Sequence, residues 1–137
     1  MILLDTSVII DARDKNSPWN AWAQNLIASA IPSEGAAVDT VILAEACVRS
    51  TVPEAVPEEF KQIGIQILDL PALAALSAGK AYAIYVQRRK DEGQIAPKIP
   101  LPDFFIGAHA EAAGFKVATR DVARFKTYYP SVQLITP

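Results

Sequence analysis

The sequence predicts an α/β protein of three layers, in which helices cover both faces of a central parallel sheet of about five strands. Two observations carry this prediction. Short apolar runs that suit buried strands alternate along the chain with longer stretches that suit helices. Proline, glycine and helix-capping residues separate the two kinds of segment. Because right-handed crossovers leave few topologies, we expect the strand order 3-2-1-4-5.

The expected strands are the five short apolar runs at residues 2–4, 36–38, 65–68, 115–118 and 132–135. The expected helices follow Asp5 and cover residues 19–30, 40–49, 72–90 and 103–113. Thr6 or Ser7 can cap the first helix, and Asp39 or Thr40 the third. Gly114 should end the last helix. The proline-containing stretches 53–59 and 94–102 are expected as loops, the former with room for one short helical turn.

Length and composition favour one compact domain over residues 1–137, with 51% hydrophobic and 20% charged residues. No apolar stretch reaches the roughly 18 to 20 residues of a membrane span, and the first residues lack the basic start of a signal peptide. We therefore expect a cytoplasmic protein. A single cysteine, Cys47, and a single histidine, His109, exclude a zinc cluster and a nuclease built on a histidine pair.

The charge is unevenly distributed along the chain, although the net charge is only −2. Residues 1–79 hold 4 basic and 10 acidic side chains, and residues 80–137 hold 9 and 5. This asymmetry suits a basic face for phosphates beside an acidic pocket for cations. An ordinary uneven surface would give the same counts, so the pattern alone does not decide.

Four acidic residues are expected to meet at one edge of the sheet, and they are Asp5, Glu45, Asp103 and Asp121. Asp5 ends the first strand and Asp121 follows the fourth, and these strands flank the point where the winding reverses. Asp103 begins the helix that leads back to the fourth strand. Glu45 lies about five residues into its helix, roughly 8 Å from the sheet edge. Its neighbours are apolar, so a polar interior site is the simplest reason for its charge.

Each acid also has a simpler interpretation. Asp103 could be a helix cap, Asp121 a turn residue, and Asp5 a strand end without a partner. Asp11 lies in a polar cluster and is expected to face solvent, as are the other remaining acids. His109 should lie deeper in the fold than Asp103 and on a different part of its helix, away from the expected acidic site.

The chain resembles the PIN-domain ribonucleases, and in particular the VapC-type toxins of bacterial and archaeal toxin–antitoxin pairs. The resemblance rests on four segments in the family's order: LLDTSVI at 3–9, VILAE at 41–45, LPDFFIGAHA at 101–110 and ATRDVARF at 118–125. Each segment alone is weakly specific, whereas the ordered set spans nearly the whole chain.

The resemblance implies a PIN-like fold and a catalytic, metal-binding quartet made of Asp5, Glu45, Asp103 and Asp121. It implies one or two Mg²⁺ or Mn²⁺ ions, since hard cations prefer oxygen ligands, and endoribonuclease products with a 5′-phosphate and a 3′-hydroxyl. It also implies a VapB-type antitoxin, a homodimer, and DNA binding only through the antitoxin. Supporting hydroxyls are expected at Thr6, Ser7 and Thr119.

Basic residues of the second half are candidates for binding the RNA substrate, and they are Arg88, Arg89, Lys90, Lys98, Arg120, Arg124 and Lys126. The run at 88–90 could equally be a solvated helix end, where cations complement the helix dipole.

Two other classes of protein remain open on the sequence. The haloacid-dehalogenase-like phosphatases also place an Asp after a strand, but their second Asp would stand where this chain has Ser7. A non-catalytic interaction module would bind no metal.

Overall fold

The computed structural model describes residues 1–137 and shows a five-stranded sheet in the order β3-β2-β1-β4-β5 with every pair parallel. The predicted fold class and strand order are therefore confirmed. The strands are β1 (Ile2–Leu4), β2 (Ala36–Asp39), β3 (Gln66–Leu68), β4 (Lys116–Ala118) and β5 (Leu134–Ile135). β1 is the central strand, with Leu3 in register with Ala37 of β2 and with Val117 of β4.

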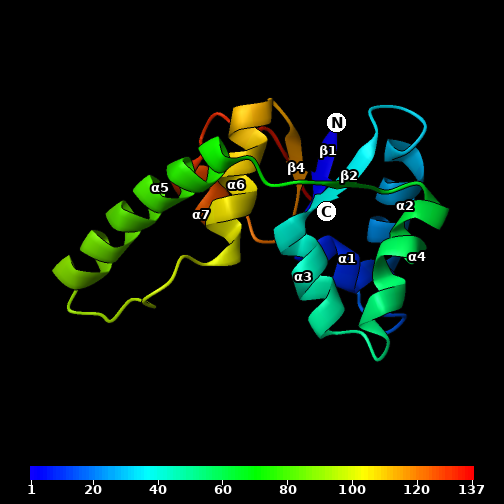
Figure 1. The fold of residues 1–137 in the computed structure, drawn as a ribbon, viewed down its shortest axis with the longest axis horizontal. Helices are drawn as coiled ribbons and strands as arrows, with labels where there is room; N and C mark the ends of the chain where they lie inside the picture. Colours follow the sequence, from blue (N-terminus) through cyan, green and yellow to red (C-terminus); the bar gives the residue numbers. More distant parts are fainter.

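Seven α-helices and one 3₁₀ turn connect the strands. They are α1 (Thr6–Arg13), α2 (Asn20–Ala30), α3 (Thr40–Val48), the turn η1 (Pro53–Ala55), α4 (Val56–Ile63), α5 (Ala72–Asp91), α6 (Pro102–Ala113) and α7 (Ala123–Tyr128). In Figure 1, α1 to α4 lie on one side of the strands, and α5, α6 and α7 lie on the other. This arrangement is the α/β/α sandwich that right-handed crossovers require. No helix is both long enough and apolar enough to cross a membrane.

Several helix ends follow from local sequence. Asp39 caps α3, because its Oδ1 accepts hydrogen bonds from the backbone N–H groups of Val41 at 2.9 Å and Ile42 at 3.1 Å. Gly114 ends α6 with a φ of 67°, a left-handed conformation that favours glycine. The cap of α1 differs from the expectation by one residue, because Asp5 itself accepts from the N–H of Thr6, at 2.8 Å.

Two helices were not predicted as such. The stretch 53–59 enters η1 and α4, and α4 buries Val56 and Phe60 one turn apart. Its prolines are tolerated because they occupy helix starts, where the missing N–H has no partner to lose. α7 follows Asp121 and has six residues, too few to show an apolar period.

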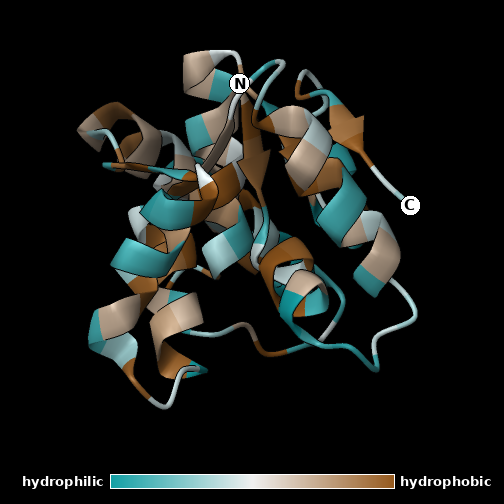
Figure 2. Ribbon diagram, turned by 90° about the vertical axis from the view of Figure 1, so that its right-hand side faces the viewer, coloured by the Kyte–Doolittle hydropathy of each residue, from teal (hydrophilic) through white to brown (hydrophobic).

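The core lies between the sheet and the helices, and the strands in Figure 2 are correspondingly coloured as hydrophobic. Leu3, Leu4, Val38 and Val117 are fully buried. On the α6 side, the ring of Tyr129 packs directly on Gly107, and the Tyr129 hydroxyl donates to the carbonyl oxygen of Phe104 at 2.7 Å. Burial of the Tyr129 hydroxyl raises its pKa. The close approach of α6 to Tyr129 leaves no space for a side chain at residue 107.

Replacing Gly107 by alanine is expected to destabilise the protein, because the new Cβ would overlap the buried Tyr129 ring. Overpacking of this kind costs about 1–3 kcal/mol, partly offset by the better helix propensity of alanine. The matched control is Gly79→Ala in α5, where a Cβ meets no atom within 4 Å. That change should stabilise by about 0.5–1 kcal/mol. Urea denaturation of both variants measures the difference, and equal effects would contradict the packing described for Gly107.

Candidate functional site

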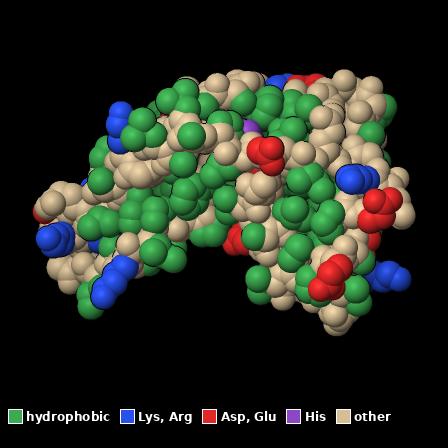
Figure 3. Space-filling model, in the orientation of Figure 1, with side chains coloured by type: hydrophobic (Ala, Val, Ile, Leu, Met, Phe, Trp, Pro, Cys, Tyr) green, Lys and Arg blue, Asp and Glu red, His purple; other side chains and the backbone are tan.

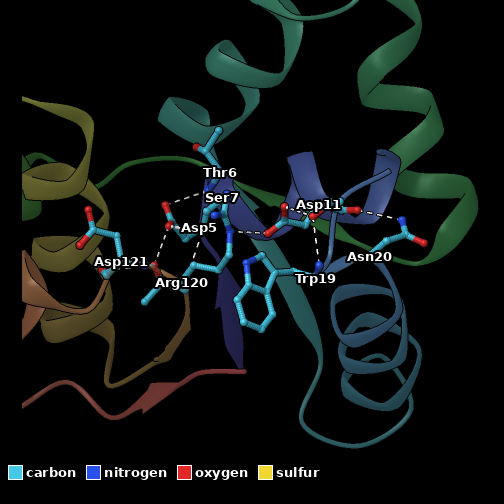
Figure 4. Close-up of polar contacts among 10 residues, drawn as sticks. Asp5, Thr6, Ser7, Asp11, Trp19, Asn20, Arg120 and Asp121 are labelled. Atoms are coloured by element: carbon cyan, nitrogen blue, oxygen red, sulfur yellow. Dashed lines mark hydrogen bonds and ion pairs between the residues drawn. The ribbon is translucent and has the colours of Figure 1, made fainter. Parts of the chain in front are cut away.

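Asp5 stands at the carboxyl end of the central strand and is 5% exposed. Its Oδ1 accepts from the N–H of Thr6, and its Oδ2 accepts from the hydroxyls of Ser7 and Thr119, both at 2.7 Å. Figure 4 shows these contacts converging on the carboxylate. Hydrogen bonds to an ionised group are stronger than neutral ones, so three donors hold this carboxylate in one orientation.

Glu45 joins this network through Thr6. The Thr6 hydroxyl donates to Glu45 Oε2, while the Thr6 backbone N–H donates to Asp5. Glu45 is half-buried and projects from the second turn of α3, as the sequence predicted from its apolar neighbours. Thr6 therefore bonds to both carboxylates, that of Asp5 directly after β1 and that of Glu45 in α3.

Asp103 is the second residue of α6 and forms an ion pair with Arg124 of α7. Burial raises the pKa of Asp103, and the negative charges of Asp5 and Asp121 raise it further, while Arg124 opposes both effects. The Asp103 side chain caps no helix, so the simple capping interpretation is wrong. Asp5 and Asp121 therefore lie near enough to Asp103 for their charges to affect its pKa.

Asp121 is exposed and lies in the loop between β4 and α7. Its backbone N–H donates to the Thr119 hydroxyl at 3.0 Å, and that hydroxyl donates to Asp5. Asp121 extends from its loop on the same side as Asp5 in Figure 4. Thr119 thus ties the position of Asp121 to the central carboxylate.

The donor set of this acidic site consists of carboxylate and hydroxyl oxygens, which suits Mg²⁺ or Mn²⁺. As the side chains stand, no three of them converge closely enough to enclose an ion. A cation already neutralises one of them, because the Arg124 guanidinium holds Asp103. The residues therefore fit a divalent ion, provided that Asp103 exchanges Arg124 for it.

Four of the basic residues predicted to bind RNA divide into two groups. Arg120 and Arg124 are paired with the carboxylates of Asp11 and Asp103. Arg88 and Arg89 line a pocket of about 300 Å³ between α5 and α7, together with Asp121. Lys126 is exposed on α7, and Lys98 is exposed in the loop before α6. On the face in Figure 3, basic side chains lie over the carboxyl end of α5.

Asp11 was expected to face solvent, and this expectation is wrong. Its side chain is buried, with 3% of the residue exposed, and it pairs with Arg120. Its place between Ile10 and Ala12, one helical turn after the buried Val8, was the signal for an inward position. His109 is also buried, and its Nδ1 lies 3.1 Å from Asp39 Oδ2.

The PIN-domain family model matches residues 2–129. The chain therefore belongs to the PIN-domain family, whose members are nucleases that generally use divalent metal ions. A search of curated proteins found no match.

Solved structures agree on the fold at low sequence identity. The VapBC2 structure from Rickettsia felis, bound to a promoter DNA fragment, has a TM-score of 0.65 and 21% identity, covering 100% of this chain and 99% of that one. VapBC-1 from nontypeable Haemophilus influenzae gives 0.65 and 20%, covering 99% and 98%. The sarcin-ricin loop cleaving toxin VapC20 of Mycobacterium tuberculosis gives 0.65 and 16%, covering 97% and 99%. The likeness extends over the whole PIN fold.

Replacing Asp103 by asparagine is expected to raise the melting temperature of the metal-free protein. The raised pKa of Asp103 means that the folded state binds its proton more tightly than the unfolded chain does, so the free energy of unfolding falls as pH rises through that interval. The gain from Asp103→Asn should therefore be absent below 3.8, the ordinary pKa of an aspartate side chain, and fully present above the folded-state pKa. Thermal melts between pH 3 and about pH 8 measure it.

The control for that series is Asp69→Asn, which changes an exposed acid outside the site. Its melting temperature should follow that of the unchanged protein at every pH. An Asp103→Asn protein that melts lower than the unchanged protein at neutral pH would show that the Arg124 pair outweighs burial and repulsion.

Proposed function

We propose that this protein is a metal-dependent endoribonuclease, the VapC-type toxin of a toxin–antitoxin pair, and that it hydrolyses phosphodiester bonds of structured RNA. The observation that carries the proposal is the hydrogen-bond network at the carboxyl edge of a PIN-domain sheet, in which Thr6 links Asp5 to Glu45 and Thr119 links Asp5 to Asp121. Asp103 lies near enough for the charges of Asp5 and Asp121 to add to the rise that burial causes in its pKa. Like charges gathered in a partly buried place need a cation to offset them. A haloacid-dehalogenase-like phosphatase would have a second Asp where this chain has Ser7, and the family model that matches the chain is that of the PIN domain.

Asp5, Glu45 and Asp103 would hold the principal Mg²⁺ or Mn²⁺, and Asp121 would complete the site through water or a second ion. Such an ion lowers the pKa of a bound water and offsets charge on the phosphate. The chain's own groups supply the orientation. Ser7 and Thr119 fix one oxygen of Asp5, and Thr6 fixes the other while it directs Glu45. Hydrolysis would leave a 5′-phosphate and a 3′-hydroxyl.

The proposed partners are a VapB-type antitoxin and a second copy of this chain. Two of the structural relatives are VapBC complexes with their antitoxins, and the one from Rickettsia felis is bound to promoter DNA. The proposal gives DNA recognition to the antitoxin, because the chain itself carries no DNA-reading motif.

The direct test is cleavage of structured RNA by the purified protein with Mg²⁺, with Mn²⁺ and with EDTA. Asp5→Asn keeps the size of the side chain and removes its charge, so it should lower kcat by at least about 100-fold. Asp69→Asn is the matched control and should retain full activity. Sequencing of the RNA ends after brief expression identifies the target. Cleavage that persists undiminished in EDTA would rule out the metal mechanism.

Arg88 is the strongest candidate for a phosphate contact, because it is exposed and lines the pocket next to Asp121. Replacing it by glutamine should weaken RNA binding and reduce the slope of log K against log salt by roughly 0.7 to 0.9. The control is Lys61→Gln, an exposed lysine of α4 on the other side of the sheet. Fluorescence anisotropy over a salt series with Asp5→Asn protein measures binding without cleavage. An unchanged slope would show that Arg88 does not contact phosphate.

A further inference from the structure

We propose that Asp11 and Arg120 form a clamp that holds the loop of residues 119–122 against α1, and that this clamp positions Thr119 and Asp121 beside Asp5. The inference deepens the proposed function, because the positioned residues belong to its site. It assigns a positioning role to both residues of the clamp. From the sequence, Asp11 was expected to face solvent and Arg120 to contact RNA.

The clamp begins at a carboxylate inside the fold. Asp11 is 3% exposed, and its Oδ2 lies 2.5 Å from Nε of Arg120. Its other oxygen, Oδ1, accepts from the Ser17 hydroxyl at 2.7 Å, and that hydroxyl accepts from the N–H of Trp19 at 3.1 Å. Figure 4 shows this group of contacts extending from Arg120 to the start of α2. Oδ1 of Asp11 therefore accepts a hydrogen bond, whereas the buried Oδ2 has no hydrogen-bond partner and depends on the ion pair with Arg120.

The backbone around Asp11 is fixed as well. The side-chain amide of Asn20 donates to the carbonyl oxygens of Asp11 at 2.8 Å and Ala12 at 3.1 Å. These are carbonyls near the end of α1, which the helix itself leaves without partners. The corner between α1 and α2 is thus a rigid base for the ion pair.

The other end of the clamp lies in the acidic site. The N–H of Arg120 donates to the Ser7 hydroxyl at 3.3 Å, and the same hydroxyl donates to Asp5 Oδ2. Arg120 is flanked by Thr119, which also donates to Asp5, and by Asp121. The loop is therefore attached to α1 through the main chain and the side chain of one residue, between two residues of the site.

The burial of Asp11 decides between a clamp and a contact to RNA. The Arg120 side chain is 38% exposed, so solvent and phosphate can reach it. If Arg120 turned towards a phosphate, it would leave a buried carboxylate without its cation, which is strongly unfavourable. The positive charge of Arg120, which could attract a phosphate, is thus already paired with Asp11.

The test compares Asp11→Asn, Arg120→Lys and the double variant Asp11→Asn/Arg120→Gln with the unchanged protein. Hydrogen exchange of the Arg120 and Asp121 amides should rise by about tenfold or more in Asp11→Asn, because both amides are protected within the clamped loop. Mn²⁺ affinity by calorimetry and kcat on RNA should each fall by about 10- to 100-fold, as for other residues that orient metal ligands. The KM for RNA should change by less than about twofold.

The variants separate positioning from the other roles. The double variant leaves no unpaired charge, so its melting temperature should recover relative to that of Asp11→Asn while Mn²⁺ affinity and kcat stay low. Recovery of all three together would reduce the pair to a purely structural role. A raised KM and a smaller salt slope in the double variant, which removes the Arg120 charge, with both quantities unchanged in Asp11→Asn, would assign Arg120 to phosphate binding. Asp14→Asn, an exposed acid at the end of the same helix, should behave as the unchanged protein.

The clamp and the proposed function can fail independently. If the unchanged protein neither binds Mn²⁺ nor cleaves RNA, the proposed function is wrong, and the exchange rates of the Arg120 and Asp121 amides still decide whether the clamp exists. If the unchanged protein is active and Asp11→Asn leaves exchange and Mn²⁺ affinity as they were, the clamp is wrong. Arg120→Lys keeps the charge next to Asp11. If Asp11→Asn fails to fold, the same measurements of amide exchange and Mn²⁺ affinity are made on Arg120→Lys.

Discussion

The acidic site depends on the hydrogen bonds that the Asp5 carboxylate accepts. Its donors come from α1 and from the loop after β4, and the carboxylate itself ends the central strand. A buried carboxylate is costly unless its oxygens are satisfied, so these donors make the position of Asp5 tolerable. The same donors link the position of Asp5 to the other acids, because Thr6 also bonds to Glu45 and Thr119 also bonds to Asp121. The geometry of the site is thus set by hydroxyl groups as much as by acids.

The fold, and the placement of Asp5 and of the loop with Asp121 at one edge of the sheet, could be predicted because both follow from topology. Apolar runs mark the strands, and a parallel sheet brings the carboxyl ends of β1 and β4 to one edge. Local rules failed where a residue's surroundings come from distant segments. Asp11 is buried against Arg120, which lies more than 100 positions away along the chain, and it also accepts a hydrogen bond from Ser17. Likewise α4 and α7 are short helices that depend on burying Val56, Phe60 and Phe125 rather than on their own periodicity.

The excess of basic residues in the second half has a structural use that composition could not show. Arg124 of α7 pairs with Asp103 of α6 on the same side of the sheet, and Arg120 of the preceding loop pairs with Asp11 of α1, so part of this positive charge balances acids within the fold. Only a remainder, with Arg88 and Arg89 beside the pocket, stays open to a ligand. The asymmetry between the halves thus reflects internal pairing as well as surface charge.

The central position of β1 also bears on when the site comes into being during synthesis. Its first acid is residue 5, yet the hydroxyl that fixes that acid is residue 119, on the far side of a crossover that includes α5 and α6. Contacts so distant in sequence form late in folding, because a long loop must close first. A nascent chain that ends before β4 therefore holds β1 and β2 but not the Thr119 hydroxyl that fixes Asp5.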